Sequence, residues 1–317
     1  MAVKQVRRAI GTMLAVAISW VLVATAAWAL VSPVRVLGVP AVQVLPSSND
    51  TFLTYTSNSI AHPKSFNAFA YRYSDGHTRR INAAHTQGWN GGFDPGTNTV
   101  IYQQIANGSN LYTFDLDTST RHKLGAIDTP NWEWMPRIST SFISFFRDYK
   151  ANGTWYTGIY LYDRTSGTTR KLAVVTALKH NSINGTLGDQ YASWTICGRT
   201  TCTAYVYDAT AHILRKIPTN NGRPQYAPAV DEVNGLVFFA RSGFGCGKGV
   251  TFYQVPVTAL GTSPTKVATL PSGIDLDGAA SLSLNADTNM YDYFFARVKC
   301  SNGSTDIYRL PSVSPGV

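Results

Sequence analysis

Three residues of this chain have side chains suited to acid–base chemistry: Glu133, His180 and Asp275. A carboxylate pair such as Glu133 with Asp275 or Asp277 could cleave a glycosidic bond, with one group as acid and the other as base or nucleophile. His85 and His180 together with Glu133 have the composition of a zinc site, if the fold brings them together. No two of these ligands are closely spaced in the sequence, so we predict no metal and no other cofactor.

A second group of residues is suited to binding rather than to catalysis. Trp89, Trp132 and Trp134, with His85 and Tyr226, could form an aromatic surface for a ligand, because indole and phenol rings combine a large apolar face with a polar atom. The alternative is structural: the same rings could wedge between packed sheets. Of the tryptophans after residue 29, we expect only Trp194 to lie in a strand and the others to lie in loops.

The common catalytic and phosphate-binding motifs are missing from the sequence. The glycine-rich run 243–249 has the wrong spacing for a phosphate loop and no Ser or Thr after Lys248. Neither the G-x-S-x-G motif of serine esterases nor the H-E-x-x-H motif of zinc proteases is present. These observations favour a non-catalytic protein.

The elements that must position these residues follow from an internal repeat. Tyrosine recurs six times in a similar apolar setting, at intervals of 41, 48, 45, 48 and 55 residues. The six positions are Tyr71, Tyr112, Tyr160, Tyr205, Tyr253 and Tyr308. Polar turns and further β-branched or aromatic runs surround them, which predicts four short antiparallel strands, A to D, in each unit. Four-stranded units repeating every 40 to 50 residues or so are typical of a β-propeller.

We therefore predict an all-β, six-bladed β-propeller of four-stranded antiparallel blades, with seven blades as the alternative. Too few residues follow Tyr308 for the last blade to form its own strand D. Two apolar segments, residues 33–37 and 41–45, precede the first unit. We expect one of them to be the outer strand of the last blade and to close the ring, which also removes an exposed sheet edge.

Several repeat endings carry a family resemblance. Residues 114–118 (Phe-Asp-Leu-Asp-Thr) and 162–167 (Tyr-Asp-Arg-Thr-Ser-Gly) resemble the repeats of TolB-like propellers, and residues 93–98 are similar to their Pro-Asp-Gly turn in a different order. The resemblance spans about residues 45–311. It implies an exported six-bladed propeller of a family in which many members bind or scaffold partners, some are attached to peptidases and some act on polysaccharides.

In a propeller, the connections from strand D to the next strand A lie on the same face as the loops between strands B and C. We call this the D–A face, and the opposite one, with the A–B and C–D turns, the A–B face. Ligands often bind where loops from all blades converge. We therefore assign the four tryptophans after residue 29 other than Trp194 to loops of the D–A face. His85, Glu133 and His180 are assigned to three successive D–A loops, and Asp275 and Asp277 to the same face.

The first 29 residues have the features of an export signal. Three basic residues precede a long apolar run, and Ala27 and Ala29 stand at the −3 and −1 positions of a cleavage site. We predict a signal peptide at 1–29 and a single propeller domain at 30–317. The alternative is a retained anchor, because residues 9–31 are long enough to span a bilayer.

The four cysteines fit an oxidising compartment. We favour the pairs Cys197–Cys202 and Cys246–Cys300 among three possible connectivities, because 197 and 202 flank a short hairpin loop and 246 and 300 occupy equivalent places in successive repeats. A zinc site is the weaker alternative, since no C-x-x-C spacing occurs.

Charge and compartment together define the expected partners. Removal of the signal lowers the formal charge from +9 to +6, and no dense run of Lys or Arg remains, so a nucleic-acid partner is not expected. We predict a secreted or periplasmic protein, with no membrane span after cleavage, that binds an extracytoplasmic protein, glycan or envelope component. The alternative is a carbohydrate-active hydrolase or lyase.

Overall fold

The computed structural model describes residues 33–38, 41–58, 62, 65–177, 181–198, 201–217, 223–242, 246–285 and 290–311. All of them belong to one structural unit, residues 31–315. The expected signal peptide, residues 1–29, and the candidate His180 lie outside the described residues. Within the described ranges, no helix has the length and apolar character needed to cross a membrane.

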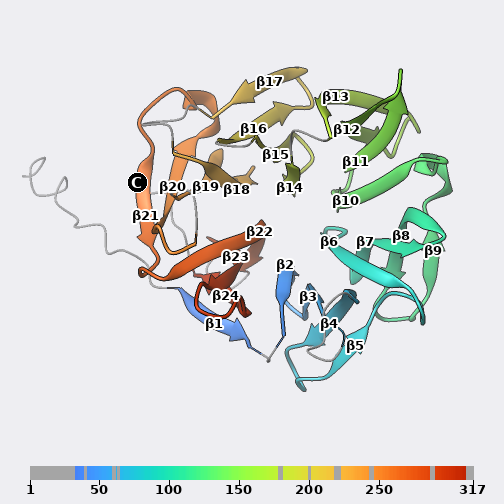
Figure 1. Cartoon of the computed structure of the whole chain (residues 1–317), viewed down its shortest axis with the longest axis horizontal. Helices are drawn as coiled ribbons and strands as arrows, with labels where there is room; N and C mark the ends of the chain where they lie inside the picture. Colours follow the sequence, from blue (N-terminus) through green and yellow to red (C-terminus); the bar gives the residue numbers. More distant parts are fainter. Residues whose placement is uncertain are drawn as a thin grey trace, which may run out of the picture. The chain divides into compact units, whose positions relative to one another are not determined.

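Six four-stranded antiparallel sheets form the six blades of a propeller, and Figure 1 shows strand A of each blade next to the centre. Blade 1 contains β2 (Gln43–Ser48), β3 (Phe52–Ser57), β4 (Asn67–Arg72) and β5 (Thr78–Arg80). Blade 2 contains β6 (Gln87–Phe93), β7 (Thr99–Ala106), β8 (Gly108–Asp115) and β9 (Arg121–Lys123). Blade 3 contains β10 (Trp132–Ile138), β11 (Phe142–Ala151), β12 (Thr154–Asp163) and β13 (Thr169–Thr176).

The remaining blades repeat this order. Blade 4 contains β14 (Asn181–Leu187), β15 (Tyr191–Cys197), β16 (Cys202–Asp208) and β17 (Ile213–Lys216). Blade 5 contains β18 (Gln225–Asp231), β19 (Leu236–Ser242), β20 (Val250–Pro256) and β21 (Thr265–Thr269). Blade 6 contains β22 (Ile274–Asn285), β23 (Met290–Lys299), β24 (Thr305–Leu310) and β1 (Val34–Leu37). Two short 3-10 helices, η1 (Gly125–Ile127) and η2 (Val257–Ala259), lie between strands.

The predicted fold, blade number and ring closure are confirmed. Strand β1 pairs antiparallel with β24, with Val34 opposite Arg309, and so supplies the missing outer strand of blade 6. An ion pair between Arg35 and Asp306, at 3.0 Å, adds to this closure. Of the two candidate segments, the first is therefore the closing strand, while the second contributes to β2, the inner strand of blade 1.

The recurrent tyrosines occupy equivalent places, since each lies in strand C of its blade. In five blades the tyrosine ring stacks on an aromatic ring directly opposite it on strand B, with centroids 5.5 to 6.1 Å apart. Cross-strand aromatic pairs of this kind stabilise a sheet. In blade 1 the residue opposite Tyr71 is Leu53. The period in the sequence thus reflects one packing position repeated around the ring.

The core is divided among the interfaces between blades. Six clusters of buried apolar side chains each contain residues of two neighbouring blades, and the cluster between blades 6 and 1 includes Leu53 and Ile307. A four-stranded sheet exposes two apolar faces, so each blade is stabilised by burial against both neighbours. A seventh cluster contains Leu45 with the partly buried Trp89, Met135 and Ile183, and it joins the inner strands of blades 1 to 4.

In every blade, the pairing between the inner strand A and strand B contains a register shift, at the same level along strand A. Two types of sequence at this shift alternate around the ring. In blades 1, 3 and 5 a non-glycine residue with positive φ precedes a proline: Leu45, Met135 and Ala227. In blades 2, 4 and 6 the sequence has glycine at this level instead. Asn90 and Asn184 donate to the carbonyl oxygens of Leu45 and Met135, both at 2.8 Å, and so join neighbouring inner strands.

Both predicted disulfides are present. Cys197–Cys202 closes the B–C hairpin of blade 4, and Cys246–Cys300 joins the B–C loops of blades 5 and 6. No free cysteine lies among the described residues. Two disulfides indicate an oxidising, extracytoplasmic environment.

Candidate functional site

The predicted binding tryptophans lie at the D–A face but in strands, so the prediction that they lie in loops was wrong. Trp89 is the third residue of β6, and Trp132 and Trp134 are the first and third residues of β10. Trp155 is the second residue of β12. The ladder of blade 3 continues far toward this face, because β11 and β12 have ten residues each and pair along their whole length. Aromatic residues favour strands, so they extend the sheet where we expected a loop.

These indoles differ in what they contact. Trp89 stacks on Phe66 with ring centroids 4.5 Å apart, and Trp134 packs edge-on against Phe146 at 5.0 Å. Trp132 and Trp155 are exposed to 49% and 44%. The structural alternative therefore applies to Trp89 and Trp134, which are partly buried in packing contacts, whereas Trp132 and Trp155 remain accessible to a ligand.

Glu133, predicted to lie in a loop, is instead the second residue of β10, where it is part of a buried ion pair. Its side chain is 1% exposed, and its Oε1 accepts hydrogen bonds from Arg147 Nε, at 2.8 Å, and from the Thr129 hydroxyl. The Arg147 guanidinium also donates to the Ile127 carbonyl and lies 4.8 Å from the centre of the Tyr160 ring. Burial raises the pKa of Glu133, and the hydrogen bonds from Thr129 and Arg147 oppose this. The carboxylate is a structural anchor between strands β10 and β11, with little surface to offer to a substrate.

Asp275 and Tyr226 are neighbours at the same face. They lie near the starts of β22 and β18, the inner strands of adjacent blades. Burial raises the pKa of Asp275, and a hydrogen bond from the Leu276 amide partly opposes this rise. Burial also raises the pKa of Tyr226; a hydrogen bond with Ser242 opposes the rise and the Asp275 charge adds to it. Among the predicted site residues that the structure describes, this half-buried carboxyl beside a phenol is the one pairing in which acid–base chemistry could take place.

The remaining candidates do not form a metal site in the described structure. His85 lies in the connection between β5 and β6, is exposed and has φ of 62°. The residues that the structure describes contain no group of three or more His, Cys, Asp and Glu placed to hold a metal ion. His180, the other imidazole of the hypothetical zinc site, is outside these residues.

A cavity that the sequence did not predict lies at the A–B face. It has a volume of about 860 Å³ and is lined by residues of all six blades, among them Phe93, Leu187 and Tyr291. Six acidic side chains line it: Asp50, Asp94, Asp115, Asp117, Asp189 and Glu232. The part of the chain that the structure describes contributes no Lys or Arg to this lining. An acidic residue recurs just after strand A in several repeats, and this signal in the sequence could have indicated the site.

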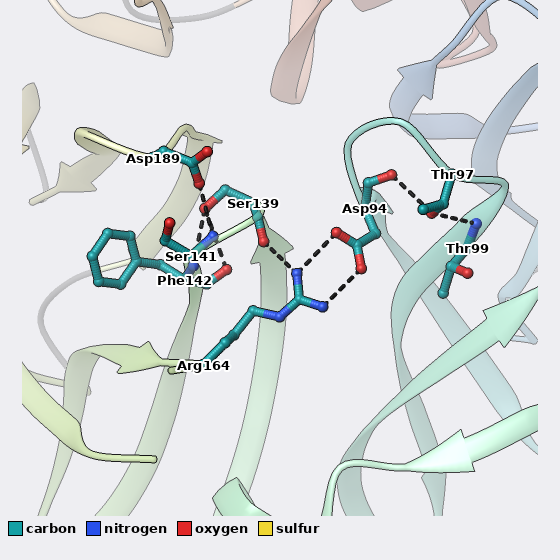
Figure 2. A network of polar contacts seen from close by, with 8 residues as sticks. All are labelled: Asp94, Thr97, Thr99, Ser139, Ser141, Phe142, Arg164 and Asp189. Carbon is teal, nitrogen blue, oxygen red and sulfur yellow. Dashed lines mark hydrogen bonds and ion pairs between the residues drawn. The ribbon is translucent and has the colours of Figure 1, made fainter. Parts of the chain in front are cut away.

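Most of these carboxylates accept hydrogen bonds from neighbouring turns, and Figure 2 shows Asp94 and Asp189. Arg164 donates to both oxygens of Asp94, each at 2.9 Å, and to the Ser139 carbonyl, which links blade 3 to blade 2. Asp189 of blade 4 accepts a hydrogen bond of 2.8 Å from the Ser141 amide of blade 3. Glu232 of blade 5 accepts from three successive amides of blade 4, those of residues 189–191, at 2.6 to 2.9 Å. These contacts form a chain from blade 5 to blade 2, which we call the turn network.

Gly188 makes room for one member of the turn network. A Cβ at this position would overlap the Glu232 carboxylate, so a larger residue would displace this carboxylate from its place against the turn. Burial alone would raise the pKa of Asp189, but hydrogen bonds from Ser141, Ser139 and Thr140 lower it below its usual value. The Asp189 carboxylate is thus stabilised by the fold and stabilises it in turn.

Comparison with known proteins gives similarity in fold alone. No family model matches the chain, and no curated protein matches its sequence. Among solved structures, an oligogalacturonate lyase from Vibrio parahaemolyticus is similar with 11% identity and a TM-score of 0.51, over 87% of this chain and 81% of that one. A putative TolB from Agrobacterium tumefaciens is similar with 11% identity and a TM-score of 0.51, over 86% and 91%.

A third similar structure is the β-propeller domain of the Trilobed protease from Pyrococcus furiosus, with 9% identity and a TM-score of 0.50, over 87% of this chain and 99% of that one. Chains of similar fold thus include a putative TolB, a lyase and the propeller domain of a protease. Fold therefore does not decide between binding and catalysis for this chain.

Proposed function

We propose that this chain is an exported, non-catalytic binding protein that holds an extracytoplasmic protein, glycan or cell-envelope component on its D–A face. The observation that carries the proposal is the exposure of Trp132 and Trp155 on that face. On the same face, Cys197–Cys202 closes the B–C hairpin of the adjacent blade 4, and Cys246–Cys300 joins the B–C loops of blades 5 and 6. A preformed surface with accessible aromatic rings binds with little loss of conformational entropy.

The opposite face supports binding less well. It has a cavity, but Asp94, Asp189 and Glu232 at the rim of this cavity are already bonded to neighbouring turns. A partner that took these carboxylates would have to replace contacts that join the blades. Nucleic acid is not expected at either face, because the positive charge is not concentrated and the cavity rim is acidic.

The test is retention of the full chain on isolated, insoluble cell-envelope polymers. We expect at least one of Trp132→Ala, Tyr226→Ala and His85→Ala to reduce retention about tenfold, the loss of about 1.4 kcal/mol. Val233→Ala is the control, because Val233 is 67% exposed in the A–B turn of blade 5. Failure of the unchanged protein to bind any fraction, or a loss with Val233→Ala as large as with the D–A variants, would contradict the proposal.

One observation favours a second function, that of a carbohydrate-active hydrolase or lyase. Asp275 is partly buried beside Tyr226 and has a raised pKa, as a general acid requires. This function predicts release of reducing ends or unsaturated product from a polysaccharide such as polygalacturonate, and loss of that activity in Asp275→Asn. Glu133→Gln is the comparison: because Glu133 is paired with Arg147, we expect it to affect folding stability more than turnover.

A further inference from the structure

Two exposed indoles lie on one surface of blade 3. Trp132 is opposite Asp148 in the β10–β11 ladder, and Asp148 is opposite Thr157 in the β11–β12 ladder. Trp155 is two residues before Thr157, so its side chain points to the same side of the sheet. From strand spacing and rise, the two tryptophans are about 12 Å apart at their Cβ atoms. We call the surface formed by Trp132, Asp148, Lys150 and Trp155 the indole shelf; Thr157, which lies between them, is buried.

Polar groups lie between the two rings. Asp148 is partly buried and accepts a hydrogen bond of 2.6 Å from the Thr157 hydroxyl, which fixes the orientation of its carboxylate. Lys150 is exposed and is directly opposite Trp155. The shelf thus alternates an apolar ring, an oriented acceptor, a donor and a second apolar ring.

Packing and a tight turn fix the position of the indole shelf. Two residues further along β10 and β11, toward the A–B face, Trp134 and Phe146 pack edge-on in the cluster between blades 3 and 4. At the end of the β11–β12 hairpin, the two strands are joined by Asn152 and Gly153 alone, with φ of 49° and 78°. Asn-Gly with positive φ at both positions is the two-residue turn that fixes hairpin register. The spacing of the two indoles is therefore a property of the folded blade and needs no ligand to form.

We propose that the indole shelf is a binding subsite for a neutral oligosaccharide, an inference that rests on the proposed binding function and names its ligand. A sugar ring has an apolar C–H face that stacks on indole, and hydroxyls around its edge that hydrogen-bond to Asp148 and Lys150. The Asp148 and Lys150 charges are opposite, which favours a neutral chain over an acidic one.

A protein partner fits this surface less well. About half of each indole is exposed, which offers roughly 120 Å² per ring, against about 800 Å² that each partner buries in a stable protein interface. An apolar protein patch would also cover Asp148 and Lys150 without hydrogen-bonding them, at a cost of about 1 to 3 kcal/mol for each unsatisfied group. Sugar hydroxyls avoid this cost.

The experiment titrates the full chain with cellotetraose, chitotetraose and trigalacturonate, followed by tryptophan fluorescence and calorimetry. We expect a neutral tetrasaccharide to bind and to change the fluorescence, and we expect Trp132→Ala and Trp155→Ala each to weaken binding at least tenfold. Asp148→Asn should weaken it by a smaller factor. The matched control is Tyr149→Ala, because Tyr149 lies on the same hairpin with its ring, stacked on Tyr156, on the reverse side.

The outcomes separate this inference from the proposed function. One result would overturn the indole shelf but leave binding elsewhere on the D–A face in place. In that result the protein is retained on envelope polymers, none of the three oligosaccharides gives a response at millimolar concentration, and Trp132→Ala and Trp155→Ala are retained as well as the unchanged protein. Equal loss in Tyr149→Ala also overturns the indole shelf. If trigalacturonate is the only oligosaccharide that binds, the proposal that the ligand is neutral is wrong. Since both indoles are exposed, we expect variants to melt within a few degrees of the unchanged protein, which verifies that they fold.

Discussion

The two faces of this propeller stabilise the ring in different ways. On the D–A face, two disulfides tie B–C loops, and the carboxyl groups of Glu133 and Asp275 have pKa values raised by burial. On the A–B face, Asp115, whose carboxylate accepts amide hydrogen bonds from Thr118 and Asp117, and Asp189 have lowered pKa values. The same functional group is thus destabilised as an anion on one face and stabilised on the other.

This difference indicates where function can reside. Side chains that hold turns together, as Asp94 and Glu232 do, cannot be given to a ligand without weakening the contacts between blades. The D–A face is held by covalent bonds and buried packing instead, so its exposed side chains remain available. A site can evolve on such a surface with little effect on folding, because the groups that bind and the groups that stabilise are different.

The largest expected effect comes from the disulfide between blades 5 and 6. Cys246 and Cys300 close a loop of 54 residues, whereas Cys197 and Cys202 are 5 residues apart. From the entropy of loop closure, replacing the first pair with serine should lower the free energy of unfolding by about 4 kcal/mol, and replacing the second pair by about 2 kcal/mol. Denaturant unfolding measures both. Equal losses would show that loop length does not govern the stability of this face.

A smaller effect is expected from the turn network. Glu232→Ala removes the acceptor of three amide hydrogen bonds, and we expect a loss of about 2 kcal/mol in the free energy of unfolding. Glu232→Gln should recover part of it, because one side-chain oxygen remains. The adjacent Val233 is the control: it is 67% exposed, so Val233→Ala should change stability by less than about 0.5 kcal/mol. If the two alanine variants are equally stable, the network does not hold the A–B face.

The sequence was sufficient for the fold because the fold depends on a repeated local pattern. Tyr112 and Tyr160 recur in strand C since each blade needs a ring at that place to pack on strand B, and Cys246 and Cys300 could be paired because they occupy equivalent loops. The turn network could not be predicted in the same way. Asp94 is an ordinary turn residue in the sequence, and its partner Arg164 is 70 positions away, in a contact that exists only once the blades are stacked.

The smallest effects distinguish the faces by pH. Asp189 has a lowered pKa in the folded chain, so it stabilises the fold above its unfolded pKa, and this contribution is lost as the pH falls through the folded value. Asp275 has a raised pKa, so its contribution is complete below the unfolded pKa and is lost as the pH rises through the folded value. At neutral pH, Asp189→Asn should therefore destabilise the protein and Asp275→Asn should stabilise it, each by less than about 1 kcal/mol because water reaches both groups. Melting temperatures measured from neutral to acidic pH should show both differences shrinking as the carboxyls become protonated. If the two substitutions change the melting temperature in the same direction, the two faces do not differ in whether they stabilise a carboxylate anion.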